Sequence, residues 1–324
     1  MKTILLNPEH ASFAPIPERL LPPVLDKARV AKIARYIPLV DGGVHEAPIS
    51  FQVALLDACF NRCVMCDHPT RPQHMIHALE WLEFLEPLRN KVESVCYSGG
   101  DPMAHPEFND VMLYHRFYGI KFGMTISGYV PPRIDMDLLK GADWVRVSLD
   151  AITPEVYAAV RGHTPIAKIV HGIDSMLEAG VNVELGITVH AGNRRDLDNV
   201  LAFADSRGIK NRFVHPIYPD SIGAEEPLAE RNIQAFSRCS AVFYQLYVDT
   251  DGSVYPCCIT AGDTRAEPQA VALGNIRDEW SETWKRVVAF SQRTKLPEIC
   301  KNCVQRLSEI NHVVEYTNTD KSFF

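Results

Sequence analysis

The sequence of 324 residues lacks any apolar stretch long enough to span a bilayer. Its first residues, MKTILLNPEH, hold one lysine and an apolar run that is too short for a secretory signal. A basic excess is missing as well, because the formal net charge is -7, whereas a general nucleic-acid-binding protein normally carries a basic face. We therefore expect a cytoplasmic protein without a membrane or nucleic-acid partner.

Cysteine is well represented, with nine residues in the chain. The cytoplasm keeps thiols reduced, so these cysteines are expected to bind metal rather than to form disulfides. Cys59, Cys63 and Cys66 lie within eight residues in DACFNRCVMCDHP, and no fourth cysteine lies nearby. A disulfide would leave one of them over. Three thiolates can hold three irons of a four-iron cluster and leave the fourth iron open to a ligand.

A zinc site is the alternative interpretation of the same loop. Structural zinc usually takes four ligands, so the three thiols would need His68 or a more distant side chain to complete the site. The spacing alone leaves this alternative open.

Strand-like and helix-like patterns alternate along the chain from about residue 49. Thr153 is the expected N-cap of a helix that begins at Pro154, and four leucines recur at helical spacing at positions 79, 82, 85 and 88. The predicted strands cover residues 49–57, 93–98, 120–127, 144–150, 182–190 and 212–217. The predicted helices cover residues 77–90, 108–118, 154–161, 166–180 and 194–206.

Repeated βα units of this kind predict a parallel sheet with right-handed crossovers. Six units are too few for a closed eight-stranded barrel, so we expect an α/β fold with an open, partial (β/α)6 TIM-like barrel. The loops at the C-terminal ends of its strands would form the active face. The alternation stops near Pro227. We therefore predict an N-terminal extension at 1–48, the barrel at 49–226 and a small cysteine-rich domain at 227–324.

The motif Cys59-x3-Cys63-x2-Cys66, directly after the first strand, resembles the signature of radical S-adenosylmethionine (SAM) enzymes. Met65 stands where that family usually has an aromatic residue. The resemblance implies that the open iron of a [4Fe–4S] cluster chelates the amino and carboxylate groups of SAM. It also implies that one electron from the cluster cleaves SAM to a 5′-deoxyadenosyl radical. The resemblance covers about residues 49–306.

The stretch SGGDP, one βα unit after the cysteines, resembles the Gly-Gly-Glu-type loop of this family. Gly99 and Gly100 permit a close approach of the backbone to a ligand, and their carbonyl groups would accept hydrogen bonds from the ammonium group of SAM. Asp101 stands in the acidic position of the loop. The resemblance therefore implies that this loop binds the cofactor.

The stretches VSLD and PEVYAAVRG also resemble the family, which implies that Ser148 and Arg161 hold the carboxylate or ribose of SAM. The planar fork of Arg161 suits a carboxylate. The alternative for Arg161 is a surface arginine near a helix end. Ser127, at the end of the third strand, is a further candidate for contact with the ribose.

Cys239, Cys257, Cys300 and Cys303 could together close a four-cysteine site in the C-terminal domain. Taken alone they suit structural zinc equally well. Behind the predicted barrel they resemble the shortened auxiliary-cluster module called the twitch domain. The fuller SPASM domain has three more cysteines after the CxxC pair, and none follows Cys303 here. The resemblance thus implies one auxiliary [4Fe–4S] cluster, and two clusters in the protein.

Two cysteines remain. Cys258 adjoins Cys257, and the spacing from Gly252 favours Cys257 as the ligand. Cys96 lies two residues before Ser98 on the second strand, so their side chains share one face of the sheet. Cys258 or Cys96 could donate a hydrogen atom to a substrate radical; the alternative is that each packs as a small apolar side chain.

The resemblance implies an oxidoreductase-like enzyme that abstracts hydrogen from an unactivated carbon of a small-molecule substrate. The favoured outcome is oxidation, with the auxiliary cluster as electron acceptor and a flavodoxin or ferredoxin as the reducing partner. Modification of a peptide and epimerisation are alternative outcomes. A redox-inert zinc protein is the alternative that involves no catalysis.

Overall fold

The computed structural model describes residues 46–66, 72–190, 192–216, 238–263, 271–297, 300 and 311. The chain divides into two compact units, one formed by residues 50–231 with 248–253 and the other by the remainder. In the described part of the chain no helix is long and apolar enough to cross a membrane.

A parallel sheet of six strands forms the first unit. The strands are β1 (Ser50–Ala54), β2 (Ser94–Ser98), β3 (Lys121–Ile126), β4 (Trp144–Ser148), β5 (Val183–Val189) and β6 (Arg212–Pro216). They neighbour one another in chain order from β1 to β6, and every pair is parallel. The α/β sheet predicted from the alternation of patterns is therefore confirmed.

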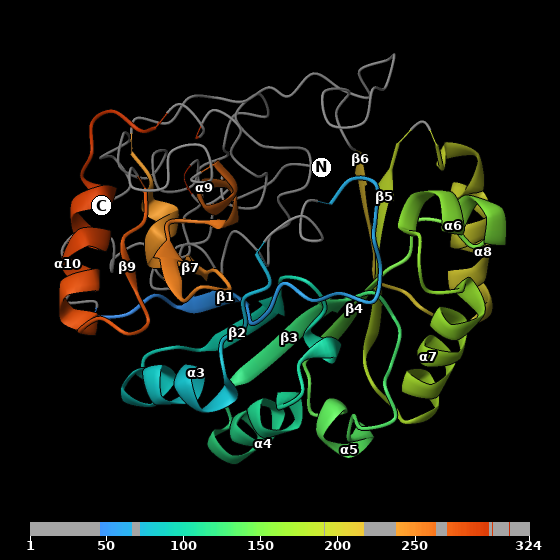
Figure 1. Ribbon diagram of the computed structural model, residues 1–324, viewed down its shortest axis with the longest axis horizontal. Coiled ribbons are helices and arrows are strands. Elements are labelled where there is room, and N and C mark those ends of the chain that lie inside the picture. Colours follow the sequence, from blue (N-terminus) through green and yellow to red (C-terminus); the bar gives the residue numbers. More distant parts are fainter. Residues whose placement is uncertain are drawn as a thin grey trace, which may run out of the picture. The chain divides into compact units, whose positions relative to one another are not determined.

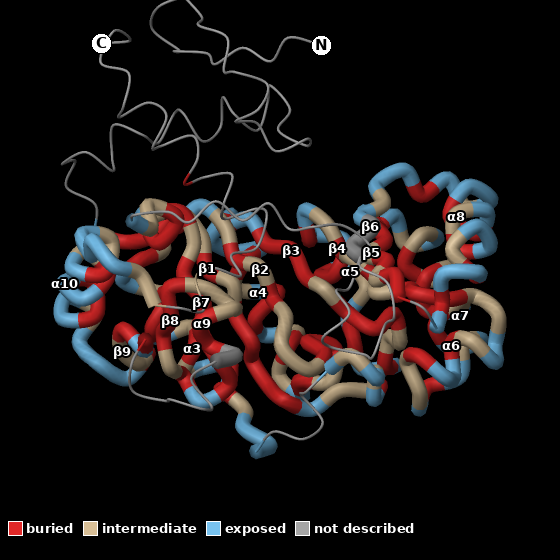
Figure 2. The backbone as a smooth tube through the Cα atoms, turned by 90° about the horizontal axis from the view of Figure 1, so that it is seen from above, coloured by how far each residue is buried: buried red, intermediate tan, exposed pale blue. Residues whose placement is uncertain are grey.

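Helices follow the strands and lie along the outer side of the curved sheet (Figure 1). They are α3 (Ala78–Leu85), α4 (Phe108–Tyr118), α5 (Met136–Leu139), α6 (Pro154–Arg161), α7 (Ile166–Glu178) and α8 (Leu197–Ser206). Short 3-10 turns occur at η3 (Glu86–Leu88), η4 (Pro102–Ala104) and η5 (Arg194–Asp196). Figure 2 shows the strands as largely buried, while exposed residues gather on the outer turns of the helices.

The two faces of the sheet differ in character. On the outer face, Phe51 packs edge-on against Trp81 of α3, and Tyr97 packs edge-on against Phe108 of α4. Along β2 the buried residues alternate with half-buried ones, so Cys96 lies on the inner face together with Ser98, as predicted. The inner face is therefore the polar one, and it points away from the helices.

The side chain of Arg146, on β4, lies on this inner face. Its guanidinium pairs with Glu184 on β5 at 2.9 Å and lies over the rings of Trp144 and Phe213, at 4.8 and 3.8 Å from their centroids. Trp144 in turn lies flat on Gly123, where an added Cβ would come within 2.1 Å of the indole ring. The glycine thus makes room for an aromatic side chain across two neighbouring strands.

Two helices show details that the sequence pattern does not give. In α3, Trp81 and Phe84 are buried and pack against Phe51 of the sheet, while Leu79 is 68% exposed. Thr153 does precede α6, yet its hydroxyl does not cap the helix. It donates instead to the carboxylate of Asp196 at 2.6 Å.

The C-terminal part of the described chain contains η7 (Ser240–Phe243), β7 (Gln245–Val248), β8 (Ser253–Tyr255), α9 (Cys258–Asp263), β9 (Gly274–Asn275) and α10 (Trp280–Ser291). Residues 46–49 group with this unit: the indole of Trp280 donates to the carbonyl of Glu46 at 2.5 Å, and the amide of Ile49 donates to Phe243 at 3.2 Å. The predicted boundary near residue 226 falls outside the described residues.

Candidate active site

The three cysteines after β1 lie close together in one loop. The amide of Asn61 donates to Sγ of Cys59 at 3.4 Å, and the amide of Cys66 donates to the carbonyl of Cys63 at 3.1 Å. Burial raises the pKa of Cys59 to about 12, and the nearby charges of Asp101, Cys63 and Cys66 add to that rise. The loop therefore gathers three thiols, as its spacing predicted. We call residues 55–66 the cluster loop.

The C-terminal end of α6 supports the cluster loop through backbone hydrogen bonds. The amide of Arg62 donates to the carbonyl of Arg161 at 3.1 Å, and the amide of Val64 donates to that of Val160 at 3.0 Å. Carbonyl groups in the last turn of a helix have no partner within the helix. The cluster loop thus completes α6, and α6 fixes the path of the loop around Cys63.

Asn61 adds side-chain contacts to the same junction. Its Nδ2 donates to the hydroxyl of Tyr157 at 3.0 Å, and its Oδ1 accepts from the amide of Thr164 at 3.2 Å. The hydroxyl of Thr164 donates to the carbonyl of Phe60 at 2.7 Å. These contacts attach the cluster loop to α6 and to the segment between α6 and α7.

The Gly-Gly loop packs directly against the cluster loop. The amide of Gly100 donates to Leu56 at 2.8 Å, and an added Cβ on Gly100 would lie 2.1 Å from the carbonyl oxygen of Ala58. Gly99 has a φ of +104°, a conformation that favours glycine. The close approach that these glycines permit is therefore an approach to the cluster loop. Their contact with SAM remains a prediction.

Asp101 is fully buried and holds β2 to β3. One carboxylate oxygen accepts from the amide of Met103 at 2.9 Å, and the other accepts from the amide of Ser127 at 2.9 Å. Burial raises the pKa of Asp101 to about 6, against the opposing effect of these bonds and of the Ser127 hydroxyl. The side chains of Asp101 and Ser127 are thus engaged with each other in this structure.

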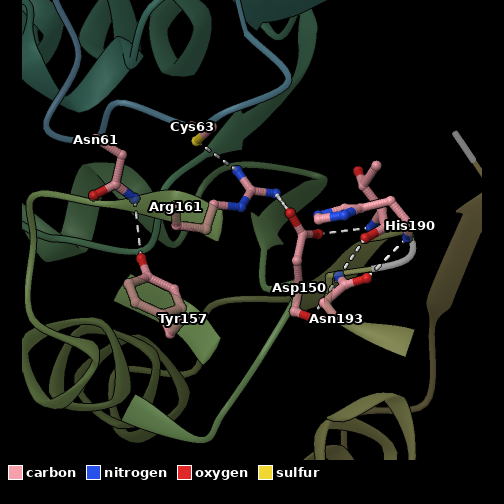
Figure 3. A network of polar contacts seen from close by, with 8 residues as sticks. Asn61, Cys63, Asp150, Tyr157, Arg161, His190 and Asn193 are labelled. Atoms are coloured by element: carbon pink, nitrogen blue, oxygen red, sulfur yellow. Dashed lines mark hydrogen bonds and ion pairs between the residues drawn. The ribbon is translucent and has the colours of Figure 1, made fainter. Parts of the chain in front are cut away.

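Arg161, the last residue of α6, faces inward (Figure 3). Its Nη2 pairs with Oδ2 of Asp150 at 2.6 Å, and its Nη1 donates to Sγ of Cys63 at 3.5 Å. The side chain of Arg161 is only 11% exposed, so the surface alternative is wrong. Two edges of the guanidinium are occupied by residues of the protein.

Three residues that the sequence analysis did not single out hold Asp150 in place. The amide of Thr188 donates to Oδ1 of Asp150 at 2.6 Å, and Nδ2 of Asn193 donates to its carbonyl at 2.8 Å. The amide of His190 donates to Oδ1 of Asn193 at 2.8 Å. Burial raises the pKa of Asp150, and the charge of Arg161 opposes that rise. No local spacing links these residues; the fold brings them together at the ends of β4 and β5.

Ser148 and Cys96 both lie on the inner face of the sheet, Ser148 at the end of β4 and Cys96 in the middle of β2. Ser148 ends β4 beside Gly186, close to the Asp150 network in sequence. Cys96 lies within β2, next to Gln52 of β1 in the sheet register, and is half-buried. The roles proposed for both side chains remain predictions.

Three thiols also gather in the C-terminal part of the chain. Burial raises the pKa of Cys239 to about 11, with a further rise caused by Cys257. Burial likewise raises the pKa of Cys300 to about 12, with further rises caused by Cys239 and Cys257. The amides of Ala241 and Val242 oppose the rise at Cys239. Cys303 lies outside the described residues.

Cys257 belongs to this group. Its charge contributes to the raised pKa values of both Cys239 and Cys300. Cys257 precedes α9 and accepts at its carbonyl from the hydroxyl of Thr260 at 2.8 Å, whereas Cys258 is the first residue of the helix. The choice of Cys257 as the ligand, made from the glycine spacing, stays a prediction.

Comparison with known families identifies both parts of this arrangement. Residues 53–204 match the model of the radical SAM superfamily, and residues 239–304 match that of an iron–sulfur cluster-binding domain, SPASM. The two matches together cover more than half of the chain. Residues 53–204 belong to the radical SAM superfamily. The chain therefore combines a radical SAM domain with a C-terminal SPASM domain, and its cofactors are SAM and two [4Fe–4S] clusters.

Individual relatives of this radical SAM enzyme are distant. A GTP 3′,8-cyclase of Nautilia profundicola is 25% identical over 174 residues, which are 50% of this chain and 54% of the relative. The mycofactocin maturase MftC of Mycobacterium ulcerans is 29% identical over 204 residues, which are 60% of this chain and 53% of the relative. The matched segments thus span about half the length of these curated relatives.

A solved structure of Streptococcus suis SuiB bound to precursor peptide SuiA shares the fold of this radical SAM enzyme. The TM-score is 0.62 at 13% identity, and the match covers 81% of this chain and 70% of that one. At this level of identity the match concerns the fold alone.

The residues of the barrel site fit the cofactors of the family. Burial raises the pKa of Cys59, and a thiol must lose its proton to bind iron, so the positive charge of the iron would offset the cost of burying this thiolate. Nε of Arg161 and Nε2 of His190 are buried and have no hydrogen-bond partner among the described residues, which leaves donors for a polar ligand beside the cluster loop. Cys59, Cys63 and Cys66 would hold the cluster, which supplies one electron to SAM when both are bound.

Proposed function

We propose that this radical SAM enzyme cleaves SAM reductively and uses the 5′-deoxyadenosyl radical to abstract a hydrogen atom from an unactivated carbon of a small molecule. The overall reaction is an oxidation, with the auxiliary cluster as acceptor of the second electron. Cys59, Cys63 and Cys66 bind the cluster that activates SAM. Cys239, Cys257, Cys300 and Cys303 bind the auxiliary cluster.

The gathering of three thiols in the C-terminal part supports this function. Cys257 contributes to the raised pKa of Cys239, both contribute to the raised pKa of Cys300, and Cys303 follows Cys300 in the motif CKNC. A cluster closed by four thiolates has no open iron to bind a substrate, but it accepts or donates an electron. Such a centre suits an electron acceptor better than a substrate-binding site.

The proposed reaction takes up one electron when SAM is cleaved and releases one electron when the substrate radical is oxidised. A reduced flavodoxin or ferredoxin supplies one electron, which breaks the sulfonium–C5′ bond and leaves methionine and the radical. The radical takes a hydrogen atom from a carbon that bears a hydroxyl group. The resulting substrate radical loses one electron to the auxiliary cluster and one proton to solvent, which gives a carbonyl group.

Replacement of Cys300 and Cys303 by Ala tests the role of the auxiliary cluster. The variant should still cleave SAM without substrate and should form no oxidised product. Because metal ligands often supply the folding energy of a small domain, circular dichroism must show that the variant is folded. An oxidised product formed at the normal rate would contradict the proposal.

Peptide modification is the second candidate function. The names of two relatives favour it, because MftC is a maturase and SuiB was solved with a precursor peptide. Anaerobic incubation with SAM, a reductant and candidate substrates from neighbouring genes, both alcohols and short peptides, separates the two functions. A mass change on a peptide alone would assign this chain to peptide modification.

The same assay identifies epimerisation. A product at the oxidation level of the substrate, with solvent deuterium at one carbon, would mean that the substrate radical receives a hydrogen atom. Cys258 and Cys96 would then be the first residues to replace.

Replacement of Cys59, Cys63 and Cys66 together by Ala tests the assignment of the SAM-binding cluster. The variant should keep the iron of one cluster and make no 5′-deoxyadenosine. A variant with full iron content and full cleavage activity would show that the cluster lies elsewhere.

A further inference from the structure

We propose that Arg161 sets the reduction potential of the SAM-binding cluster by donating an N–H···S hydrogen bond to the thiolate of Cys63. The inference rests on the proposed assignment of Cys59, Cys63 and Cys66 as ligands of that cluster. It gives Arg161 a role that does not require SAM to be bound.

Two contacts, one with Cys63 and one with Asp150, fix the position of the Arg161 guanidinium, which is the donor. Nη1 of Arg161 lies 3.5 Å from Sγ of Cys63, and Nη2 lies 2.6 Å from Oδ2 of Asp150 (Figure 3). The side chain of Asp150 is fully buried, and that of Arg161 is 11% exposed. Asp150 is itself held by the amide of Thr188 at 2.6 Å. A guanidinium is a rigid plane, so its position on Asp150 also directs its other edge toward Cys63.

The backbone fixes the acceptor relative to the donor. The amides of Arg62 and Val64, which flank Cys63, donate to the carbonyls of Arg161 and Val160 at 3.1 and 3.0 Å. The sulfur and the guanidinium therefore belong to two segments that are hydrogen-bonded to each other on both sides of the contact. Thermal motion of either segment carries the other with it, which keeps the N–H on the sulfur.

Such a contact changes the energy of cluster reduction. Reduction adds negative charge to the cluster and its sulfur ligands, and hydrogen bonds to the sulfurs are a known determinant of the potential. An ionised donor makes a stronger hydrogen bond than a neutral one. The reduced cluster therefore gains more from Arg161 than the oxidised cluster does, and the potential becomes less negative. Asp150 offsets part of the charge of Arg161 but leaves the directed N–H in place.

Anaerobic redox titration of the loaded enzyme, followed by electron paramagnetic resonance, tests the inference. The signal that changes when SAM is added belongs to the SAM-binding cluster, and its midpoint is then measured without SAM. In Arg161→Gln the reduced-to-oxidised ratio at a fixed potential should fall about tenfold or more, which is a shift of about 59 mV to more negative values for one electron. The midpoint of the auxiliary cluster should not move.

Arg146→Gln is the matched control. Arg146 lies on β4 and, like Arg161, pairs with a carboxylate, that of Glu184 at 2.9 Å. Its guanidinium lies over the rings of Trp144 and Phe213. Its replacement should leave the midpoint unchanged. An unchanged midpoint in Arg161→Gln, or an equal shift in both variants, would overturn the inference.

If Arg161→Gln binds too little iron for a redox titration, Asp150→Asn provides a second test of the inference. The amide retains an oxygen for Thr188 and removes the negative charge beside the guanidinium, so the N–H on Cys63 becomes a stronger donor. The midpoint should move to less negative values, and a shift in the other direction or no shift would overturn the inference. A separate result would contradict the proposed function: the variant with Cys59, Cys63 and Cys66 replaced by Ala would keep the SAM-binding cluster. That result would reject the ligand assignment, whereas an unchanged midpoint in Arg161→Gln would reject only the role of Arg161.

Discussion

Nδ2 of Asn61 donates to the hydroxyl of Tyr157 at 3.0 Å, across 96 residues of sequence. Asn61 is also the acceptor for the amide of Thr164, so one buried side chain joins the cluster loop to α6 and to the turn that follows it. The positions of Cys59 and Cys63, on either side of Asn61, therefore depend on a contact that the cysteine motif does not reveal.

Asn61→Ala should destabilise the enzyme by about 1–3 kcal/mol, because it leaves a buried hydroxyl and a buried amide without partners. The variant should also lose iron from the SAM-binding cluster faster in air. Denaturant unfolding and timed iron analysis measure both effects. Asn182→Ala is the control, since Asn182 donates to Asp143 at an exposed site. Equal effects of the two substitutions would show that the buried contacts of Asn61 contribute no more to stability or iron retention than an exposed hydrogen bond does.

Gly100→Ala should destabilise the enzyme by about 3 kcal/mol or more, because the new methyl group would meet backbone atoms of the cluster loop rather than a movable side chain. Gly119→Ala provides the comparison. Its Cβ would enter open space, so only the strain of a φ of +69° remains, at about 1 kcal/mol. The yield of folded protein and its iron content report the difference. A well-folded Gly100→Ala variant with full iron would contradict the close packing of the two loops.

Cys257→Ala and Cys258→Ala form a pair that tests the auxiliary site. The first should lose the iron of one cluster, because Cys257 faces Cys239 and Cys300. The second should keep it. Iron and sulfide analysis of the two proteins, purified side by side without oxygen, measures the contrast. Loss of the cluster in Cys258→Ala alone would move the ligand by one residue.

His115 should make the stability of the fold depend on pH. It is buried on α4, its Nδ1 donates to the carbonyl of Ile120 at 3.0 Å, and its Nε2 accepts from the hydroxyl of Tyr97 at 2.6 Å. Burial lowers its pKa to about 4 from the ordinary value of 6.5. The unfolded chain therefore binds the proton first as the pH falls, so this contribution to stability decreases from about pH 6.5 down to about pH 4.

The effect of His115 should be about 1 kcal/mol of unfolding free energy between about pH 7.5 and pH 5.5. Denaturant unfolding of the loaded enzyme at both pH values measures it. His115→Gln retains a donor and an acceptor but does not titrate, so its stability should depend less on pH. Substitution of the exposed His171 should leave the dependence as it is in the original protein. The same slope in His115→Gln would assign the pH dependence to other groups.

Local patterns predicted the parts of this fold that local forces determine. The bounds of α4, Phe108–Tyr118, follow from helical spacing and from the glycine at 119, and the cysteine spacing predicted the gathering of Cys59, Cys63 and Cys66 because those residues are neighbours in sequence. The leucine spacing predicted a helix at α3 but did not show that Trp81 and Phe84 would make its contacts with the sheet.

The partners of Arg161 show the limit of such prediction. Its position at a helix end was visible in the sequence, but its contacts with Asp150 and Cys63 depend on the curvature of the sheet and on a loop 98 residues earlier. The same holds for Thr153, whose hydroxyl finds Asp196 on a later segment. Long-range partners compete with local ones, and the sequence pattern contains only the local ones.

The backbone bonds between the cluster loop and α6 have a consequence for the order of events during synthesis. The ribosome makes Cys63 98 residues before Arg161, and the N-terminal parts of a chain emerge first. During this interval the chain contains the three thiols but not yet Val160 and Arg161. The carbonyl groups of these two residues accept the hydrogen bonds from the amides of Val64 and Arg62. Iron delivered to the nascent chain would meet an unsupported loop. If Cys59, Cys63 and Cys66 hold the cluster as proposed, we expect its stable loading to be a late step, after residues 154–164 have folded onto the loop; a chain that stalls before them should expose these cysteines to oxygen.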